Sequence, residues 1–169
     1  MLSGIQFAIL ITSDRASSGE RPDLTIPLLQ EMIEEQHGAC RETAIISDDF
    51  QAIKDTLFAW AEAEEIDVIL TSGGTGISTR DVTVDATLDI IEKEFPGFGE
   101  EMRRRSVEMT PFAILSRATA GLLGNTMIVN LPGNPTGAGE CLGYIMKPLA
   151  HAVHLVRKSI QDCTEDHSD

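Results

Sequence analysis

Short apolar runs separated by amphipathic stretches predict alternating strands and helices in the first half of the chain. The runs at 5–12, 41–47 and 66–72 are rich in aliphatic residues and too short for helices, which favours buried strands. Between them, apolar residues recur at helical spacing from Pro27 to Gly38 and from Ile53 to Ala61. The pattern therefore predicts three strands joined by two helices.

The second half is predicted to add helices and one hairpin. Four elements are expected, namely helices near 84–94 and 99–108, interrupted at Phe95-Pro96-Gly97, and β-like segments at 118–123 and 126–131. Gly124-Asn125 joins the two β-like segments and tolerates the positive φ of a tight turn. Residues 137–160 read as one or two helices broken near Lys147-Pro148, and the polar residues 161–169 as a frayed end.

Strands that alternate with helices predict a three-layer α/β/α fold around a mostly parallel sheet, with the hairpin as its antiparallel element. A chain of 169 residues with no low-complexity linker is expected to form a single domain over residues 1–169. Ligands of such sheets bind beyond the carboxyl ends of the strands, where this chain concentrates polar and glycine-rich segments.

Composition narrows the classes of partner. The 27 acidic residues against 13 basic ones give a net charge of −14, which argues against nucleic acid and anionic membranes as partners. No apolar run approaches the length of a membrane span and the start does not resemble a signal peptide, so a cytoplasmic location is expected. An odd number of cysteines, 3, without C-x-x-C spacing indicates neither a disulfide framework nor a zinc site.

The segment Ser72-Gly73-Gly74-Thr75-Gly76 follows a predicted strand and is the strongest candidate ligand site. Its 3 glycines let the backbone turn sharply and bring several N–H groups close to an anion. Taken alone, the loop is as well explained by a tight strand-to-helix turn. It is neither a Walker A sequence nor G-x-G-x-x-G.

Two aspartates near strand ends are candidate ligands of Mg²⁺. Asp48 follows the second strand and Asp81 follows the glycine loop, and an acidic protein that handles polyphosphates commonly holds the cation with one or two carboxylates. The alternatives are structural. Asp48 or Asp49 is a possible helix cap, and Asp81 a possible loop or cap residue beside Thr83.

Few cationic side chains accompany these segments. Arg15, Arg80 and Arg117 are candidates for neutralising phosphate charge, although isolated arginines are often solvated bystanders. His151 and His154 stand three residues apart with no third ligand nearby, which favours a surface pair over a metal site.

Five ordered motifs resemble a known family, the molybdenum-cofactor proteins that include the molybdopterin adenylyltransferases (MogA/MoaB-like). The motifs are SDRASSG at 13–19, TSGGTGISTRDVT at 71–83, PGFGEEMR at 96–103, TPFAILSRA at 110–118 and IVNLPGNP at 128–135. The resemblance runs from about Ile5 to Arg157. Five blocks in order are far more specific than one glycine loop.

The resemblance implies a trimeric α/β protein in which the terminal phosphate of molybdopterin attacks the α-phosphate of Mg-ATP, with a downstream molybdenum-insertion protein as a further partner. It implies that Asp48 and Asp81 are essential carboxylates that hold Mg²⁺ and position the nucleotide, and that Ser116 contacts phosphate. The residues implied to bind substrate are Ser13, Asp14, Ser72, Gly73, Gly74, Thr75, Gly76, Pro132, Gly133 and Asn134.

The chain also departs from the family pattern. Leu24 stands where some members carry a lysine, which removes a possible phosphate contact. Because the chain ends soon after its last helix, a stand-alone enzyme is expected rather than a fusion with the insertion domain. Two other functions stay open, a non-catalytic molybdopterin carrier or scaffold and a different phosphate-handling enzyme on the same fold.

Overall fold

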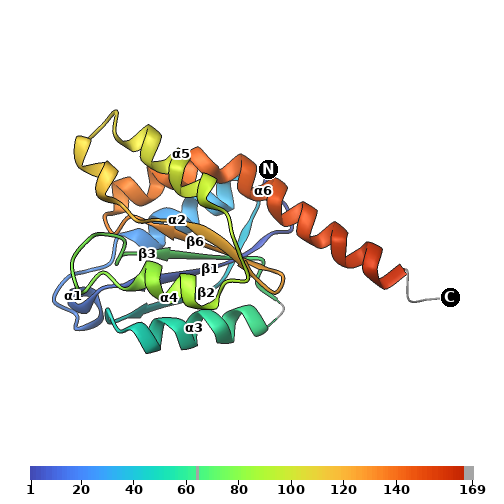
Figure 1. Cartoon of the computed structure of the whole chain (residues 1–169), viewed down its shortest axis with the longest axis horizontal. Helices are drawn as coiled ribbons and strands as arrows, with labels where there is room; N and C mark the ends of the chain where they lie inside the picture. Colours follow the sequence, from blue (N-terminus) through green and yellow to red (C-terminus); the bar gives the residue numbers. More distant parts are fainter. Residues whose placement is uncertain (64, 166–169) are drawn as a thin grey trace.

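The computed structural model describes residues 1–63 and 65–165, which form a sheet with helices on both faces (Figure 1). The strands are β1 (Gln6–Thr12), β2 (Ala39–Ile46), β3 (Val68–Ser72), β4 (Lys93–Glu94), β5 (Ala120–Leu123) and β6 (Thr126–Leu131). The helices are α1 (Asp14–Ser17), α2 (Thr25–Glu35), α3 (Phe50–Glu62), α4 (Thr83–Ile90), α5 (Pro96–Ser106), the 3-10 helix η1 (Pro111–Leu115) and α6 (Pro135–Glu165).

The strand order in the sheet is β2-β1-β3-β6-β5-β4. The neighbours β2, β1, β3 and β6 pair in parallel, whereas β5 pairs antiparallel with both β6 and β4. Gly124, at φ +56°, turns the β5–β6 hairpin as expected. The predicted three-layer α/β fold with a mostly parallel sheet is therefore confirmed.

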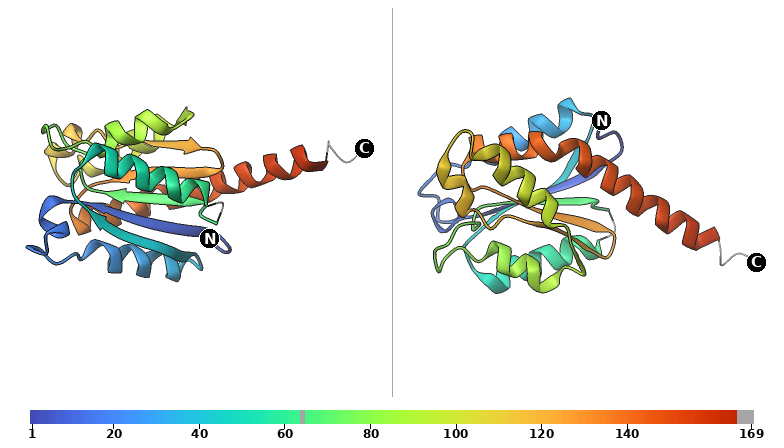
Figure 2. Two further views of the ribbon diagram at one scale, coloured as in Figure 1. Left: turned by 90° about the horizontal axis from the view of Figure 1, so that it is seen from below. Right: turned by 45° about the horizontal axis from the view of Figure 1, so that its top comes forward.

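The two faces of the sheet bury separate apolar clusters. On one face, alternate residues of β1 such as Phe7 and Ile9 pack with α2, α5 and α6. On the other face, Ala8 and Leu10 pack with α3 and α4. Figures 1 and 2 show these helices on opposite sides of the strands, with α6 extending past the sheet. The β1 strand is apolar from Phe7 to Ile11 because both of its faces are covered.

The segment between α4 and α5 differs from the prediction. The helix expected over 84–94 ends at Ile90, and Lys93–Glu94 forms β4. The N–H groups of Glu92 and Phe95 donate to Leu122 and Ala120 at 2.8 and 2.7 Å, which adds this segment to the sheet beside β5. The prediction of a helix was wrong there because pairing with a distant strand overrides local helical periodicity.

The prediction of a break near Lys147-Pro148 was also wrong, because α6 continues through Pro148. Proline lacks an N–H and deprives the carbonyl four residues earlier of its usual bond. Pro148 is exposed, whereas Ile145 and Leu149 beside it are buried against the sheet, so packing on the buried face holds the helix together. The helix extends into the segment 161–169 expected to fray, of which residues 166–169 lie outside the described residues.

No helix within the described ranges combines the length and the apolar character that crossing a bilayer requires.

Candidate active site

The carboxyl ends of four parallel strands meet at one edge of the sheet, on the left in Figure 1. Ser13 follows β1, Asp48 lies two residues beyond β2, the glycine loop begins at the end of β3 and Pro132 follows β6. Ser72 Oγ donates to the Pro132 carbonyl at 2.7 Å and so links the last two segments. The segments that sequence predicted to converge therefore lie along one edge.

The glycine loop is crowded against the strand and helix beside it. Gly73 and Gly74 have φ values of +112° and +60°, which favour glycine. A Cβ on Gly73 would overlap the Thr12 carbonyl oxygen, and one on Gly74 would overlap the Thr83 hydroxyl. Both glycines are needed because the backbone adopts positive φ and lies directly against its neighbours.

A buried polar network lies under this loop. Thr12 Oγ1 and Thr83 Oγ1 share a hydrogen bond of 2.8 Å, and Thr87 Oγ1 donates to the Thr83 carbonyl at 2.9 Å. Asn130 Nδ2 donates to Thr71 Oγ1 and Thr87 Oγ1, each at 2.9 Å, while its buried Oδ1 has no partner among the described residues. The network ties β1, β3 and β6 to α4, so it sets the position of the helix that follows Asp81.

Arg117 holds the loop from the outside. Its N–H donates to the Thr75 carbonyl at 2.8 Å and its Nε to the Gly76 carbonyl at 2.8 Å. Its Nη2 donates to the Asp81 carbonyl, and both Nη atoms bond the Asp85 carboxylate at 2.9 and 3.0 Å. This pairing lowers the pKa of Asp85. The guanidinium therefore serves the loop, rather than the phosphate-neutralising role considered from the sequence.

The helix caps separate the roles of Asp48 and Asp49. Asp49 Oδ1 accepts the Ala52 N–H at 2.8 Å and is the N-cap of α3. Asp48 instead exchanges hydrogen bonds with Asp14: each backbone N–H donates to the other residue's carboxylate, at 3.0 and 3.1 Å. The capping explanation for Asp48 is therefore wrong, because its neighbour fills that position.

Charge is unevenly distributed among the carboxylates. Hydrogen bonds from the Arg80 guanidinium, at 2.7 to 3.2 Å, lower the pKa of Asp14. Burial raises the pKa of Asp48, and the negative charges of Asp14 and Asp81 add to that rise. The hydrogen bond from the Asp14 N–H lowers the same pKa but does not cancel the effect of burial. Asp48 therefore lies where negative charge is partly buried and repelled, an environment that a bound cation would relieve.

The carboxylates of Asp48 and Asp81 have open oxygens that suit Mg²⁺. Within the part of the chain that the structure describes, no three His, Cys, Asp or Glu side chains lie together as a metal cage. Asp81 Oδ2 accepts the Ser78 N–H at 2.8 Å and Asp48 Oδ2 the Asp14 N–H, while the Oδ1 atoms of these two carboxylates accept none within the described residues. Two carboxylates with one open oxygen each fit Mg²⁺ that takes its remaining ligands from water and phosphate.

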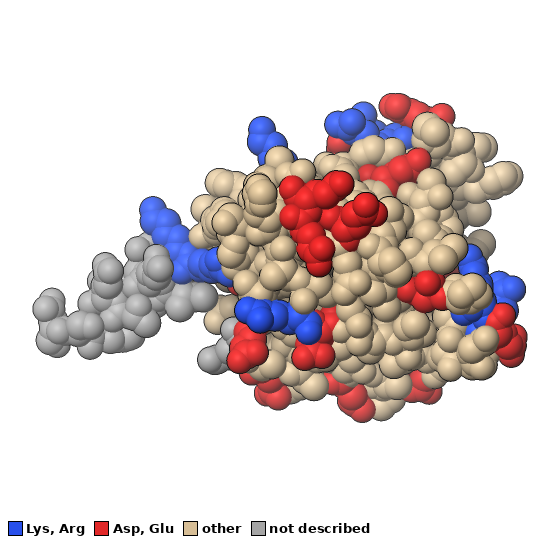
Figure 3. Space-filling model, turned by 180° about the vertical axis from the view of Figure 1, so that it is seen from behind, with Lys and Arg blue, Asp and Glu red and all other residues tan. Residues whose placement is uncertain are grey.

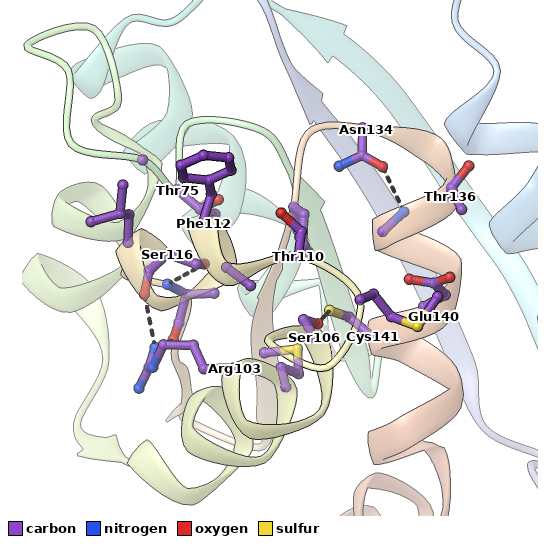
Figure 4. Close-up of a pocket in the computed structure, with 18 of the residues that line it drawn as sticks. Thr75, Arg103, Ser106, Thr110, Phe112, Ser116, Asn134, Thr136, Glu140 and Cys141 are labelled. Carbon is purple, nitrogen blue, oxygen red and sulfur yellow. Dashed lines mark hydrogen bonds between the residues drawn. The ribbon is translucent and has the colours of Figure 1, made fainter.

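A cavity of about 560 Å³ opens on the other side of the glycine loop, between η1, the end of α5 and the start of α6 (Figure 4). In Figure 4, Phe112 and Thr110 lie on one side of it and Asn134, Thr136 and Glu140 on the other. Asn134 Oδ1 accepts the Gly137 N–H at 2.6 Å at the beginning of α6. The residue is thereby anchored, because its side chain completes the first turn of that helix.

The expected site residues divide around this cavity. Those that line it are Thr75, Gly76, Pro132, Asn134 and Ser116. Ser13 and Gly133 line a small hollow of about 30 Å³ together with the exposed Leu24. The remaining ones are absent from both linings, namely Asp14, Asp48, Ser72, Gly73, Gly74 and Asp81.

Asp81 and Ser116 lie near the boundary. A Cβ on Gly76, which lines the cavity, would stand 2.8 Å from Asp81 Oδ2, so the Asp81 carboxylate lies directly behind the cavity wall. Ser116 Oγ accepts the Ala118 N–H at 3.3 Å, and the Ser116 carbonyl accepts from Arg103 Nη1 at 3.1 Å. Ser116 lies beside the loop because the N–H of the next residue, Arg117, donates to the Thr75 carbonyl, whereas Asp81 lies against Gly76.

Sequence reasoning missed several cavity residues. The structure adds apolar side chains from η1 and its surroundings, namely Ile77, Met109, Phe112 and Leu115, and polar ones from α6, namely Thr136 and Glu140. The exposed apolar run PFAIL at 111–115 was the available signal, since it lies inside one of the five motifs. Large apolar side chains left in water beside a cavity are typical of a ligand-binding surface.

The net charge of the chain does not attract anions. Figure 3 shows a group of acidic side chains near the middle of the face behind Figure 1, with basic side chains mostly toward its edges. The whole chain has a net charge of −14. Any phosphate must therefore be held by backbone N–H groups, a cation or local arginines.

Comparisons with known proteins identify the family of this chain. A family model described as a probable molybdopterin binding domain matches residues 8–152. The molybdopterin adenylyltransferase of Helicobacter pylori strain J99 is 37% identical over 154 residues, which cover 90% of this chain and 88% of that protein. The crystal structure of the molybdopterin biosynthesis enzyme MoaB from Thermus thermophilus has a TM-score of 0.85 at 40% identity and covers 90% of this chain and 96% of its own.

A longer relative contains the same unit. The molybdenum cofactor synthesis protein cinnamon of Drosophila melanogaster is 36% identical over 169 residues, which are 99% of this chain but only 28% of that protein. Residues 8–152 are most of the chain, and they include the glycine loop, Asp48, Asp81 and the cavity-lining segments. The chain therefore belongs to the family of molybdopterin-binding domains of molybdenum cofactor biosynthesis.

Proposed function

We propose that this chain is a molybdopterin adenylyltransferase, which transfers AMP from Mg-ATP to the terminal phosphate of molybdopterin and releases pyrophosphate. The observation that carries the proposal is the position of Asp81, whose carboxylate lies directly behind Gly76 in the wall of a largely apolar cavity. One loop thus separates a place for an organic ring from a place for a metal-bound phosphate. The names of the relatives support the same reaction.

The cavity is the proposed pterin site. Its volume of about 560 Å³ is in the range of sites for small organic ligands. Phe112 and Leu115 offer apolar contact to a flat ring, while Asn134, Thr136 and Glu140 offer hydrogen bonds to its polar edge. The phosphate of molybdopterin would then lie toward Ser116 and the glycine loop.

The nucleotide is proposed to bind on the side of Asp48 and Asp81. An oxygen of the terminal molybdopterin phosphate attacks the α-phosphorus of ATP, and the bond from that phosphorus to the oxygen of the leaving pyrophosphate breaks. Both reactants are anions, so the protein must orient them and offset their charge. When bound, Mg²⁺ supplies positive charge that stabilises the departing pyrophosphate.

The chain's own groups perform the orientation. Asp48 and Asp81 would hold the cation through their open oxygens. The glycine loop would offer backbone N–H groups to phosphate. The buried network under the loop and the Arg117 bonds outside it keep this arrangement rigid. A loop that is already ordered orients the phosphates without further loss of conformational freedom on binding.

The decisive test is incubation with molybdopterin and Mg-ATP followed by chromatography for the adenylylated product. The wild type should form product, whereas Asp81→Asn should still bind molybdopterin but form none, because the charge at the metal site changes while the cavity keeps its shape. Asp89→Asn is the matched control, since Asp89 is an exposed aspartate of α4 that pairs with Lys54. Its turnover should be unchanged.

Two results would contradict the proposal. If the Asp81→Asn variant forms product at the wild-type rate, the Asp81 carboxylate is not needed for adenylylation. Wild-type protein that binds molybdopterin but makes no product would favour the carrier or scaffold.

The wider setting of the reaction is part of the same proposal. We propose a homotrimer in the cytoplasm that passes its product to a molybdenum-insertion protein. Sedimentation velocity tests the assembly, because a stable monomer at micromolar concentration would contradict the trimer.

A further inference from the structure

Arg80 joins two ligand loops through a single ion pair. It precedes Asp81 in the loop after β3, and its guanidinium reaches Asp14 after β1. Nη2 donates to Oδ2 and Oδ1 of Asp14 at 2.7 and 2.8 Å, and Nε donates to Oδ2 at 3.2 Å. The planar guanidinium thus engages both oxygens of one carboxylate, a geometry that phosphate oxygens also satisfy.

The pair is exposed and therefore easily broken. The Arg80 and Asp14 side chains are 62% and 50% exposed. Water solvates both charges well at such exposure, so their separation costs little free energy. Arg117, which bonds three loop carbonyls through its backbone and side chain, has no comparable freedom.

Arg80 also places positive charge near further carboxylates of the site. Its charge interacts with Asp48 and Asp49 as well as with Asp14. Asp14 and Asp48 lie close enough to exchange backbone hydrogen bonds. A polyphosphate that enters this edge brings more negative charge, and so it competes with Asp14 for the guanidinium.

We propose that the Arg80 guanidinium exchanges partners during nucleotide binding: it releases the Asp14 carboxylate and bonds the phosphates of the bound nucleoside triphosphate instead. Asp14 then faces the cation that accompanies the phosphates, beside Asp48. The exchange keeps the number of charge-assisted bonds to Arg80 nearly constant, which makes the site responsive to phosphate without a large rearrangement. This inference rests on the proposed function, because it assigns the nucleotide to the side of the carboxylates.

The test is equilibrium binding of ATP by calorimetry, once with Mg²⁺ and once with EDTA. Arg80→Gln should weaken binding at least tenfold in both conditions. Asp14→Asn should tighten binding in EDTA, because Arg80 is released, and weaken it with Mg²⁺, because a carboxylate facing the cation is lost. Arg104→Gln is the control, since Arg104 is a 59% exposed arginine paired with Glu101 on α5, and its affinity should stay within twofold of the wild type.

A double variant separates the exchange from general electrostatics. Removing any negative charge near the site would favour ATP in EDTA, but that effect would persist without Arg80. If Asp14 acts through Arg80, Asp14→Asn should have no effect on ATP affinity in EDTA when added to Arg80→Gln. Thermal unfolding of each variant checks that the fold is intact.

The outcomes separate this inference from the proposed function. The exchange is wrong if the Arg80→Gln variant binds ATP with the same affinity as the Arg104→Gln control. If the wild type still forms product, the enzyme assignment is unaffected by that result. The same holds if Asp14→Asn tightens ATP binding equally with and without Arg80. A wild type that binds no ATP would overturn both.

Discussion

Gly74 offers a strict test of how the glycine loop is built, because the chain contains a matched control. Gly74 and Gly124 have nearly the same positive φ, +60° and +56°. A Cβ at Gly124 would meet nothing within 4 Å, whereas one at Gly74 would lie 2.9 Å from Thr83 Cβ and 3.1 Å from Thr83 N. Alanine carries the strain of positive φ at both positions, and only at Gly74 does it also meet crowded neighbours.

The expected magnitudes follow from these contacts. Alanine at positive φ costs about 1 to 2 kcal/mol at either position. At Gly74, displacement of the fully buried Thr83 adds about 1 to 3 kcal/mol for overpacking. Loss of its 2.8 Å bond to Thr12 adds about 1 kcal/mol. Gly74→Ala should therefore destabilise the fold by about 3 to 6 kcal/mol, and Gly124→Ala by about 1 to 2 kcal/mol.

Urea unfolding followed by circular dichroism measures both free energies of unfolding. The comparison should use midpoints and a common slope, because each variant unfolds the same chain. If the two variants differ by less than about 0.5 kcal/mol, the extrapolation error, then the loop is not crowded as described and the reasoning is refuted.

Three further results are expected. Arg117→Lys should lower the free energy of unfolding by about 2 kcal/mol, because an ammonium cannot bridge both loop carbonyls and Asp85. Amide hydrogen exchange in the loop should become faster in this variant, and an unchanged exchange rate would contradict the reasoning. Asp48→Asn should raise the free energy of unfolding at pH 7, by less than about 1 kcal/mol, and leave it unchanged near pH 3, because burial raises the pKa of Asp48 and its ionisation therefore opposes folding as pH rises. A lower free energy of unfolding in this variant at pH 7 would contradict the reasoning. Arg104, followed by Arg105, lowers the pKa of Glu101 to about 2, so its stabilising charge should be lost only as pH falls toward that value, and the carboxyl signal in NMR should titrate near 2 rather than near the ordinary 4.5.

Local patterns predicted most of the regular elements. The β1 run and the helical spacing before β2 are explained by short-range periodicity, and the structure has a strand and a helix there. The errors occurred where distant contacts decided the outcome. Lys93–Glu94 is extended because β5 pairs with it, and α6 continues through Pro148 because its buried face packs on the sheet.

The candidate site shows the same division. The family resemblance pointed to Asp48, Asp81 and the glycine loop as candidate site residues, and Asp49 rather than Asp48 proved to be the helix cap. Sequence alone did not separate the residues that line the cavity from those behind its wall. It also did not reveal that Arg117 is occupied by loop carbonyls while Arg80 is paired with an exposed partner.

The order of residues along the chain determined the alternation of strands and helices, the family and the identity of the glycine loop, because these depend on spacing between near neighbours. Only the tertiary structure decided that this loop is the wall between a cavity and a group of carboxylates. That role depends on Thr12, Thr83 and Arg117, which approach the loop from other elements. Contacts between residues far apart in sequence leave no periodic pattern along the chain, so they are seen only in the folded structure.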